Sequence, residues 1–223
     1  MATAGLPLGT YGGHGGVLTV LDMTFLLRFG AICGVLAGLC IAVPGAIEAF
    51  TGETAATSFA LGLSPALAMP LVTALYLGQS RTAGRLSTVG YAVNLIGLGL
   101  FGGAAYSLNL ALFYLDEAIV EELAAPTRIA LLGSALVFVV GSLLFGIAMV
   151  RARVYPQPAA WTYTIALPLF ALAAPLPDSP LTSALHVIAG ASIGWLATAV
   201  LAEHRTPGEQ TSPRVATLGA SAG

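Results

Sequence analysis

TFLLRFGAICGVLAGLCIAVPGAIEAF, residues 24–50, decides the class of this protein. The stretch holds only two charged side chains, Arg28 near its start and Glu48 near its end. Its length exceeds the roughly 20 helical residues that cross the hydrocarbon core of a bilayer. It lacks the period-two alternation of a barrel strand. The stretch therefore predicts a membrane-spanning helix with a basic start and an acidic end.

The composition of the whole chain agrees with this prediction. Of its 223 residues, 57% are hydrophobic and 8% are charged, and the mean hydropathy is +0.90. Soluble domains carry about a quarter charged residues. We therefore predict an integral membrane protein. The net charge of −2 argues against a nucleic-acid partner, which would require a basic patch.

Five further apolar stretches follow, and the six together predict an all-α, polytopic membrane bundle. The fifth is about 14 residues long and contains Pro168, so it crosses only if it extends or if the bilayer thins around it. The predicted spans are residues 24–50, 58–77, 87–115, 129–150, 161–174 and 181–202. We expect residues 23–203 to form the transmembrane domain and residues 1–22 and 204–223 to be disordered tails. No convincing internal repeat relates the first three spans to the last three, so an inverted-repeat architecture is not visible in the sequence.

Charges on the two sides of these spans are sorted by sign. Seven of the eight cationic side chains fall on one side and seven of the ten acids on the other. Positive charge accumulates in short cytoplasmic loops. Both termini are therefore expected in the cytoplasm, with the protein in the cell membrane.

Small residues recur at helical spacing on the first and last spans. Gly34, Gly38 and Glu48 fall within one narrow arc of the first helix, and a GxxxG pair, Gly190 and Gly194, lies on the sixth. Small residues mark the surfaces at which membrane helices approach closely. Glu48 is therefore expected to point into the bundle.

Three ionisable residues fall in the same predicted layer of the membrane and are the candidate catalytic residues. Glu48 and Asp116 end the first and third spans, and His186 lies about one turn inside the sixth. Ionisable groups are costly inside membranes and are functional candidates there. Each also has an ordinary interpretation. Glu48 could be solvated at the interface, Asp116 could belong to a solvated acidic loop, and His186 could donate to a backbone carbonyl.

The predicted substrate-binding residues lie along the third span. A carboxylic acid in an apolar pocket would remain protonated and could donate its proton to an alkene. Phe101, Tyr106 and Tyr114 could stabilise the resulting cation through their ring faces. Asn109 completes this set, although an asparagine can also be an interhelical hydrogen-bonding residue.

These acids lie in two short segments, GAIEAF with Glu48 and FYLDEA with Asp116 and Glu117. With them, residues 24–203 resemble in architecture the small integral-membrane terpene cyclases of microbial secondary metabolism. The resemblance implies a short helical bundle in which acidic residues start the cyclisation of a prenylated, isoprenoid-type substrate. The implied partner is a hydrophobic small molecule, within membrane lipid.

Two other functions fit the same residues. A proton- or cation-coupled transporter or channel subunit would titrate Glu48 or Asp116, and at this size it would require a homo-oligomer. A non-catalytic bundle would bind another membrane protein through its glycine faces. We predict no metal site, because clustered ligands are lacking. We predict no cofactor either, because the GxGxxG at residues 97–102 lies inside an apolar stretch and not at a strand-to-helix turn.

Overall fold

The computed structural model describes residues 14–176 and 179–203, and within them every regular element is helical. The all-α prediction is confirmed. The elements are α1 (His14–Thr51), α2 (Ala55–Gln79), α3 (Gly84–Leu110), the 3-10 helix η1 (Leu112–Tyr114), α4 (Glu117–Glu121), α5 (Ala125–Ala152), α6 (Gln157–Ala173) and α7 (Pro180–Glu203).

Five of these helices are long and apolar enough to cross a membrane, which supports a multi-pass membrane protein. They are α1 from Asp22, α2, α3 with the turn after it, α5 and α7. Helix α6 has 17 residues, or about 25 Å at 1.5 Å per residue. A typical hydrocarbon core is about 30 Å thick. The sixth crossing therefore stays a prediction.

The ends of the predicted domain differ in one respect from the structure. Helix α1 already begins at His14, inside the stretch 1–22 that we expected to be a tail. The apolar residues that precede the first predicted span simply continue its helix. Residues 1–13 and 204–223, the remainder of the predicted tails, lie outside the described residues.

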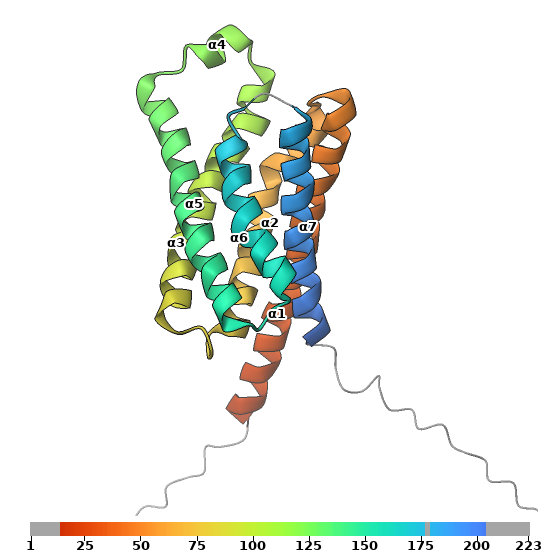
Figure 1. Cartoon of the computed structure of the whole chain (residues 1–223), viewed down its shortest axis with the longest axis vertical. Helices are drawn as coiled ribbons and strands as arrows, with labels where there is room; N and C mark the ends of the chain where they lie inside the picture. The colour runs from red at the N-terminus through yellow and green to blue at the C-terminus, as the bar shows by residue number, and fades with distance from the viewer. Residues whose placement is uncertain (1–13, 177–178, 204–223) are drawn as a thin grey trace, which may run out of the picture.

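The six long helices close into a ring (Figure 1). Going round it, α1 packs on α2, α2 on α3, α3 on α5, α5 on α6, α6 on α7, and α7 back on α1. Neighbouring helices are antiparallel. Gly34 of α1 meets Ala197 of α7, for example, whereas Gly45 further along α1 meets His186 further back along α7. The two most extensive contacts are α1 with α7 and α3 with α5.

Glycines bring the backbones of these two helix pairs into contact. A Cβ atom on Gly38 would lie 2.6 Å from the Gly190 carbonyl oxygen, and one on Gly190 would lie 2.5 Å from the Gly38 carbonyl oxygen. In the other pair, a Cβ on Gly97 would lie 2.6 Å from the Cα of Phe138. The predicted glycine faces of the first and last spans are thus helix contacts within this chain. Gly34, Gly38 and Gly190 are therefore packed within this chain, whereas a Cβ on Gly194 would meet nothing within 4 Å.

The charges are sorted between the two ends of the ring, as their order in the sequence predicts. One end, called here the arginine end, lies at the bottom of Figure 1 and contains the α2–α3 and α5–α6 connections. Exposed cations there include Arg81, Arg85, Arg151 and Arg153, whereas Arg128, near the start of α5, is an exposed cation at the other end. The other end, called here the acidic end, contains the α1–α2 connection and α4, with the exposed acids Glu53, Asp116 and Glu122.

Candidate functional site: a central aromatic cavity

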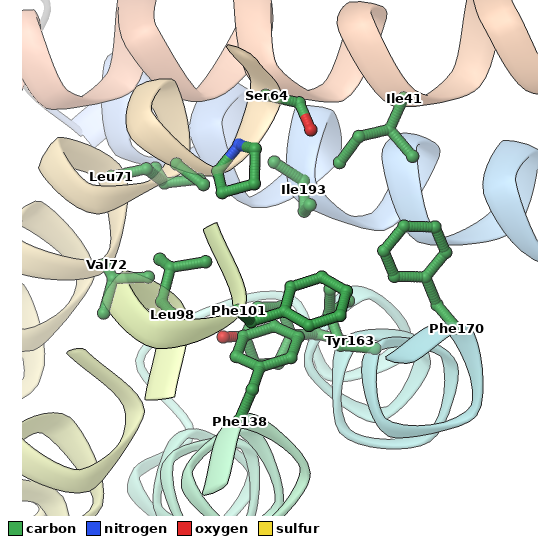
Figure 2. Close-up of a pocket in the computed structure, with 13 residues that line it drawn as sticks. Ile41, Ser64, Leu71, Val72, Leu98, Phe101, Phe138, Tyr163, Phe170 and Ile193 are labelled. Atoms are coloured by element: carbon green, nitrogen blue, oxygen red, sulfur yellow. The ribbon is translucent and has the colours of Figure 1, made fainter. Parts of the chain in front are cut away.

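A cavity of about 30 Å³ lies inside the ring (Figure 2). Each of the six long helices contributes to its wall, with Ile41 from α1, Pro65 from α2, Phe101 from α3, Phe138 from α5, Phe170 from α6 and Ile193 from α7. This volume holds about two water-sized groups. A larger ligand would therefore require the helices to move apart.

Two hydroxyl groups interrupt the apolar wall, and one of them is already bonded. Ser64 donates through Oγ to the carbonyl oxygen of Leu61 at 2.9 Å. In an unbroken helix that carbonyl would accept from the N–H of residue 65, but Pro65 has no N–H. The serine therefore satisfies a backbone acceptor that the proline leaves open.

The second hydroxyl belongs to Tyr163. Asn94 donates through Nδ2 to the Tyr163 Oη at 3.0 Å, and both side chains are buried. Asn94 Oδ1 is buried and has no hydrogen-bond partner among the described residues. Because the tyrosine oxygen accepts from Asn94, its own O–H is left to donate elsewhere. It is a candidate donor to an acceptor atom in the cavity.

Aromatic side chains dominate one side of the cavity, as Figure 2 shows. Phe101 and Phe138 stack with ring centroids 5.0 Å apart and planes 10° apart. Phe170 approaches Phe101 edge-on at 6.1 Å. Phe170 also contacts the imidazole of His186 edge-on at 4.9 Å. The Phe170 side chain therefore connects the cavity wall to the one histidine among the predicted catalytic residues.

His186 lies at the interface of α1 and α7, and Glu48 lies near the end of α1; both are towards the acidic end. Gly45 of α1 packs directly against His186, and Glu48 follows one turn later on the same face. Glu48 is 8% exposed, so the prediction that it points into the bundle is confirmed. His186 Nδ1 lies 2.7 Å from the carbonyl oxygen of Thr182. Since a carbonyl only accepts, Nδ1 carries the proton of that bond, which is the ordinary interpretation we gave for this residue.

The other predicted site residues lie away from the cavity. Asp116 is exposed just before α4, and Tyr106 and Tyr114 are 54% and 65% exposed. Asn109 donates through Nδ2 to Ala105, in its own helix, at 2.8 Å. It therefore does not bridge two helices through this bond.

For Asp116, the reason for this separation is that α3 ends earlier than the sequence predicts. We expected the third span to reach residue 115, which would place Asp116 on the same helical face as Asn109. Instead α3 ends at Leu110, and the chain turns through η1 before α4 begins. Of the predicted substrate-binding set only Phe101 lines the cavity.

Sequence reasoning missed most of the side chains that form the site. Phe138, Tyr163 and Phe170 line the cavity, and Asn94 supports Tyr163. Asn94 alone carried a signal, since an amide in the middle of an apolar helix needs a partner. Nothing in the sequence distinguishes Phe138 and Phe170 from phenylalanines that face lipid.

Comparison with known proteins adds no relative, since no family model, curated protein or solved structure matches the chain. In the part of the chain that the structure describes, no group of three His, Cys, Asp or Glu residues could hold a metal ion. Cys33 and Cys40 are both free thiols.

Proposed function

We propose that the protein is a membrane-embedded enzyme that acts on a hydrophobic, isoprenoid-type substrate in the central cavity. One observation carries the proposal: four aromatic side chains, Phe101, Phe138, Tyr163 and Phe170, line a cavity whose wall contains no charged residue. Aromatic faces stabilise cations at close range. Such a wall suits a reaction that passes through a carbocation and excludes water from it.

Glu48 and His186 supply the proton chemistry in this proposal. Rotation of the Phe170 side chain would join the cavity to the imidazole that it now contacts. The acid form of Glu48 then gives its proton to an alkene carbon, and the π electrons form the new C–H bond. The remaining carbon becomes a cation that a second double bond attacks to close a ring. Nε2 of His186 removes a proton from the neighbouring carbon and returns it to the Glu48 carboxylate, so the product is an isomer of the substrate.

The topology we propose has six crossings with both termini in the cytoplasm. The arginine end would face the cytoplasm, because short loops there carry the cations. Helix α6 fills the place in the ring between α5 and α7, which supports a sixth crossing despite its length. The acidic end, near Glu48, would then face outward.

A product profile by mass spectrometry tests the proposal. Membranes that contain the wild type, Glu48→Gln or Asp116→Asn are incubated with geranylated and farnesylated phenols. Asp116→Asn is the matched control, because it removes a carboxylate that is exposed and outside the cavity. We expect an isomer of unchanged mass with the wild type and the control, and none with Glu48→Gln. No new isomer from folded wild-type protein, or an undiminished yield from Glu48→Gln, would overturn the mechanism.

A further inference from the structure

The contact between α1 and α7 and the contact between α3 and α5 have the same register. A Cβ atom on Gly34 of α1 would lie 2.9 Å from the Cβ of Ala197 on α7. Adding 103 to residue number 34 gives Val137 on α5. Subtracting 100 from residue number 197 gives Gly97 on α3. These residues are also in contact, since a Cβ on Gly97 would lie 2.8 Å from the carbonyl carbon of Val137.

A second contact obeys the same two offsets. A Cβ on Gly190 of α7 would lie 2.7 Å from the backbone nitrogen of Ala42 on α1. The equivalent positions are Gly90 of α3 and Phe145 of α5, and a Cβ on Gly90 would lie 2.9 Å from the backbone nitrogen of Phe145. The two helix pairs therefore have the same register at two contacts, which lie about two helical turns apart.

The helix ends and breaks match as well. Helices α1 and α5 end at Thr51 and Ala152, so α5 ends two residues earlier than the offset of 103 predicts; the residue after each helix is left-handed, with φ 70° at Gly52 and φ 54° at Arg153. Pro65 of α2 and Pro168 of α6 are 103 residues apart, the same offset as for α1 and α5. Each proline comes about three turns into its helix. Both are buried.

From these matches we infer that the chain is an inverted-topology repeat, and that its two halves let the central cavity open alternately to the two sides of the membrane. The first half is α1 to α3 and the second is α5 to α7, with α4 in the link. Because each half has three antiparallel helices, the second half begins at the opposite end from the first (Figure 1). Such repeats place binding sites near the bilayer midplane, at the interface of the halves.

The cavity occupies that place between the two proline-containing helices. Pro65 lines it from α2, and the neighbours of Pro168 on α6, Leu167 and Phe170, line it from the other half. Each proline removes one backbone hydrogen bond from its helix at the level of the cavity. Helices α2 and α6 can therefore bend there, while the glycine-packed pairs α1–α7 and α3–α5 move as units.

A hydrogen bond joins the two halves at the arginine end. Tyr155, in the α5–α6 connection, donates to the carbonyl oxygen of Leu75 on α2 at 2.9 Å. The equivalent of Tyr155 in the first half is Gly52, beside which there is open space. Among the described residues this hydrogen bond has no counterpart at the acidic end, and breaking it should favour opening at the arginine end.

Cysteine accessibility tests the inference without any substrate, so its result is independent of the proposed enzymatic activity. Ser64→Cys is placed in the cavity wall of a protein whose native cysteines, Cys33 and Cys40, are replaced by alanine. A charged, membrane-impermeant methanethiosulfonate is applied to one face of the membrane at a time. The exposed controls Ser107→Cys and Ser80→Cys should react from the acidic and the arginine end only. We expect Ser64→Cys to react from both faces.

Adding Tyr155→Phe should raise the labelling rate of Ser64→Cys from the arginine end at least threefold and leave the other rate unchanged or lower. Val72→Cys, also in the wall, repeats the measurement if Ser64→Cys fails to fold. The inference would be overturned if Ser64→Cys reacted from a single face both with and without Tyr155→Phe. It would also be overturned if neither cavity cysteine reacted while the two control cysteines did.

The equivalence of the prolines gives a second, sharper measurement. Pro65→Ala and Pro168→Ala each restore a continuous helix, in opposite halves of the repeat. In an inverted repeat the two prolines lie in halves of opposite orientation. One variant should therefore slow the labelling of Ser64→Cys mainly from one face, and the other variant should slow it mainly from the opposite face. Equal effects of both variants on the same face would contradict an inverted repeat.

Discussion

Asn94 on α3 and Tyr163 on α6 are joined by a buried hydrogen bond of 3.0 Å, between helices that are not neighbours in the ring. Substituting Tyr163 by Phe should destabilise the protein by about 2 kcal/mol, because it leaves the buried amide without its partner. Substituting both residues, Asn94→Leu with Tyr163→Phe, should cost less than the two single changes added together. A double-mutant cycle of unfolding free energies measures this coupling, and strict additivity would show that the bond contributes nothing.

Gly190 and Gly194 form a GxxxG pair, yet their substitution should have unequal effects. A Cβ on Gly190 would lie 2.5 Å from the Gly38 carbonyl oxygen, whereas one on Gly194 would meet nothing within 4 Å. Gly190→Ala should therefore destabilise the protein by about 2 kcal/mol through overpacking, and Gly194→Ala should leave stability nearly unchanged. Thermal unfolding in detergent would measure both. Equal losses would show that the α1–α7 contact is not as close as described.

Tyr155 should make stability depend on alkaline pH. Burial, and to a lesser extent the carboxylate of Glu203, raises the pKa of Tyr155 above its ordinary value. Below about pH 10 the phenol is neutral in both the folded and the unfolded chain, so its contribution to stability is constant. Above about pH 10 only the unfolded chain loses the proton, so the free energy of unfolding should fall.

The variant Tyr155→Phe separates this effect from general alkaline denaturation. It should lose about 1 kcal/mol at neutral pH through the missing bond to Leu75. Its stability should also fall less steeply than that of the wild type above about pH 10. Unfolding free energies measured from pH 8 upward would show the difference. Parallel curves for the two proteins would mean that Tyr155 is not the titrating group.

The aromatic cavity predicts how a bulkier wall affects turnover. Phe138→Trp adds volume at the cavity wall, whereas Leu136→Trp adds a similar indole on the same helix at a position that is 56% exposed. We expect product formation by the proposed enzyme to fall at least tenfold with Phe138→Trp and to change little with Leu136→Trp. An unchanged rate in both would place the reaction outside this cavity.

The sequence predicted the helices of this fold well, because hydropathy and charge act locally. Four of the six predicted spans agree with the observed helices to within a few residues at either end. The first span instead begins much earlier, at His14, and the third ends earlier, at Leu110. That early end separates Asp116 from the helical face on which its spacing had placed it.

The closure of the ring and the composition of the cavity were not predictable in the same way. Both depend on which helices meet, and an apolar face looks alike whether it meets lipid or another helix. Tyr155 and Tyr163, for example, resemble residues of an interfacial aromatic belt, yet each is only 3% exposed. The two halves share the geometry of their helix contacts but have very few identical residues at equivalent positions. The inferred repeat is therefore not visible in the sequence alone.

The left-handed backbone at Arg153 has a consequence for how the chain is made. Arginine, unlike glycine, pays a steric penalty of about 1 to 2 kcal/mol in this conformation. A glycine there would make the folded protein easier to form, but it would remove a cation from the loop between α5 and α6. Cations in short loops near helix ends set the orientation of a membrane protein. In the proposed topology, in which the arginine end is cytoplasmic, Arg153 therefore favours the correct orientation in the membrane at a cost in the stability of the folded protein.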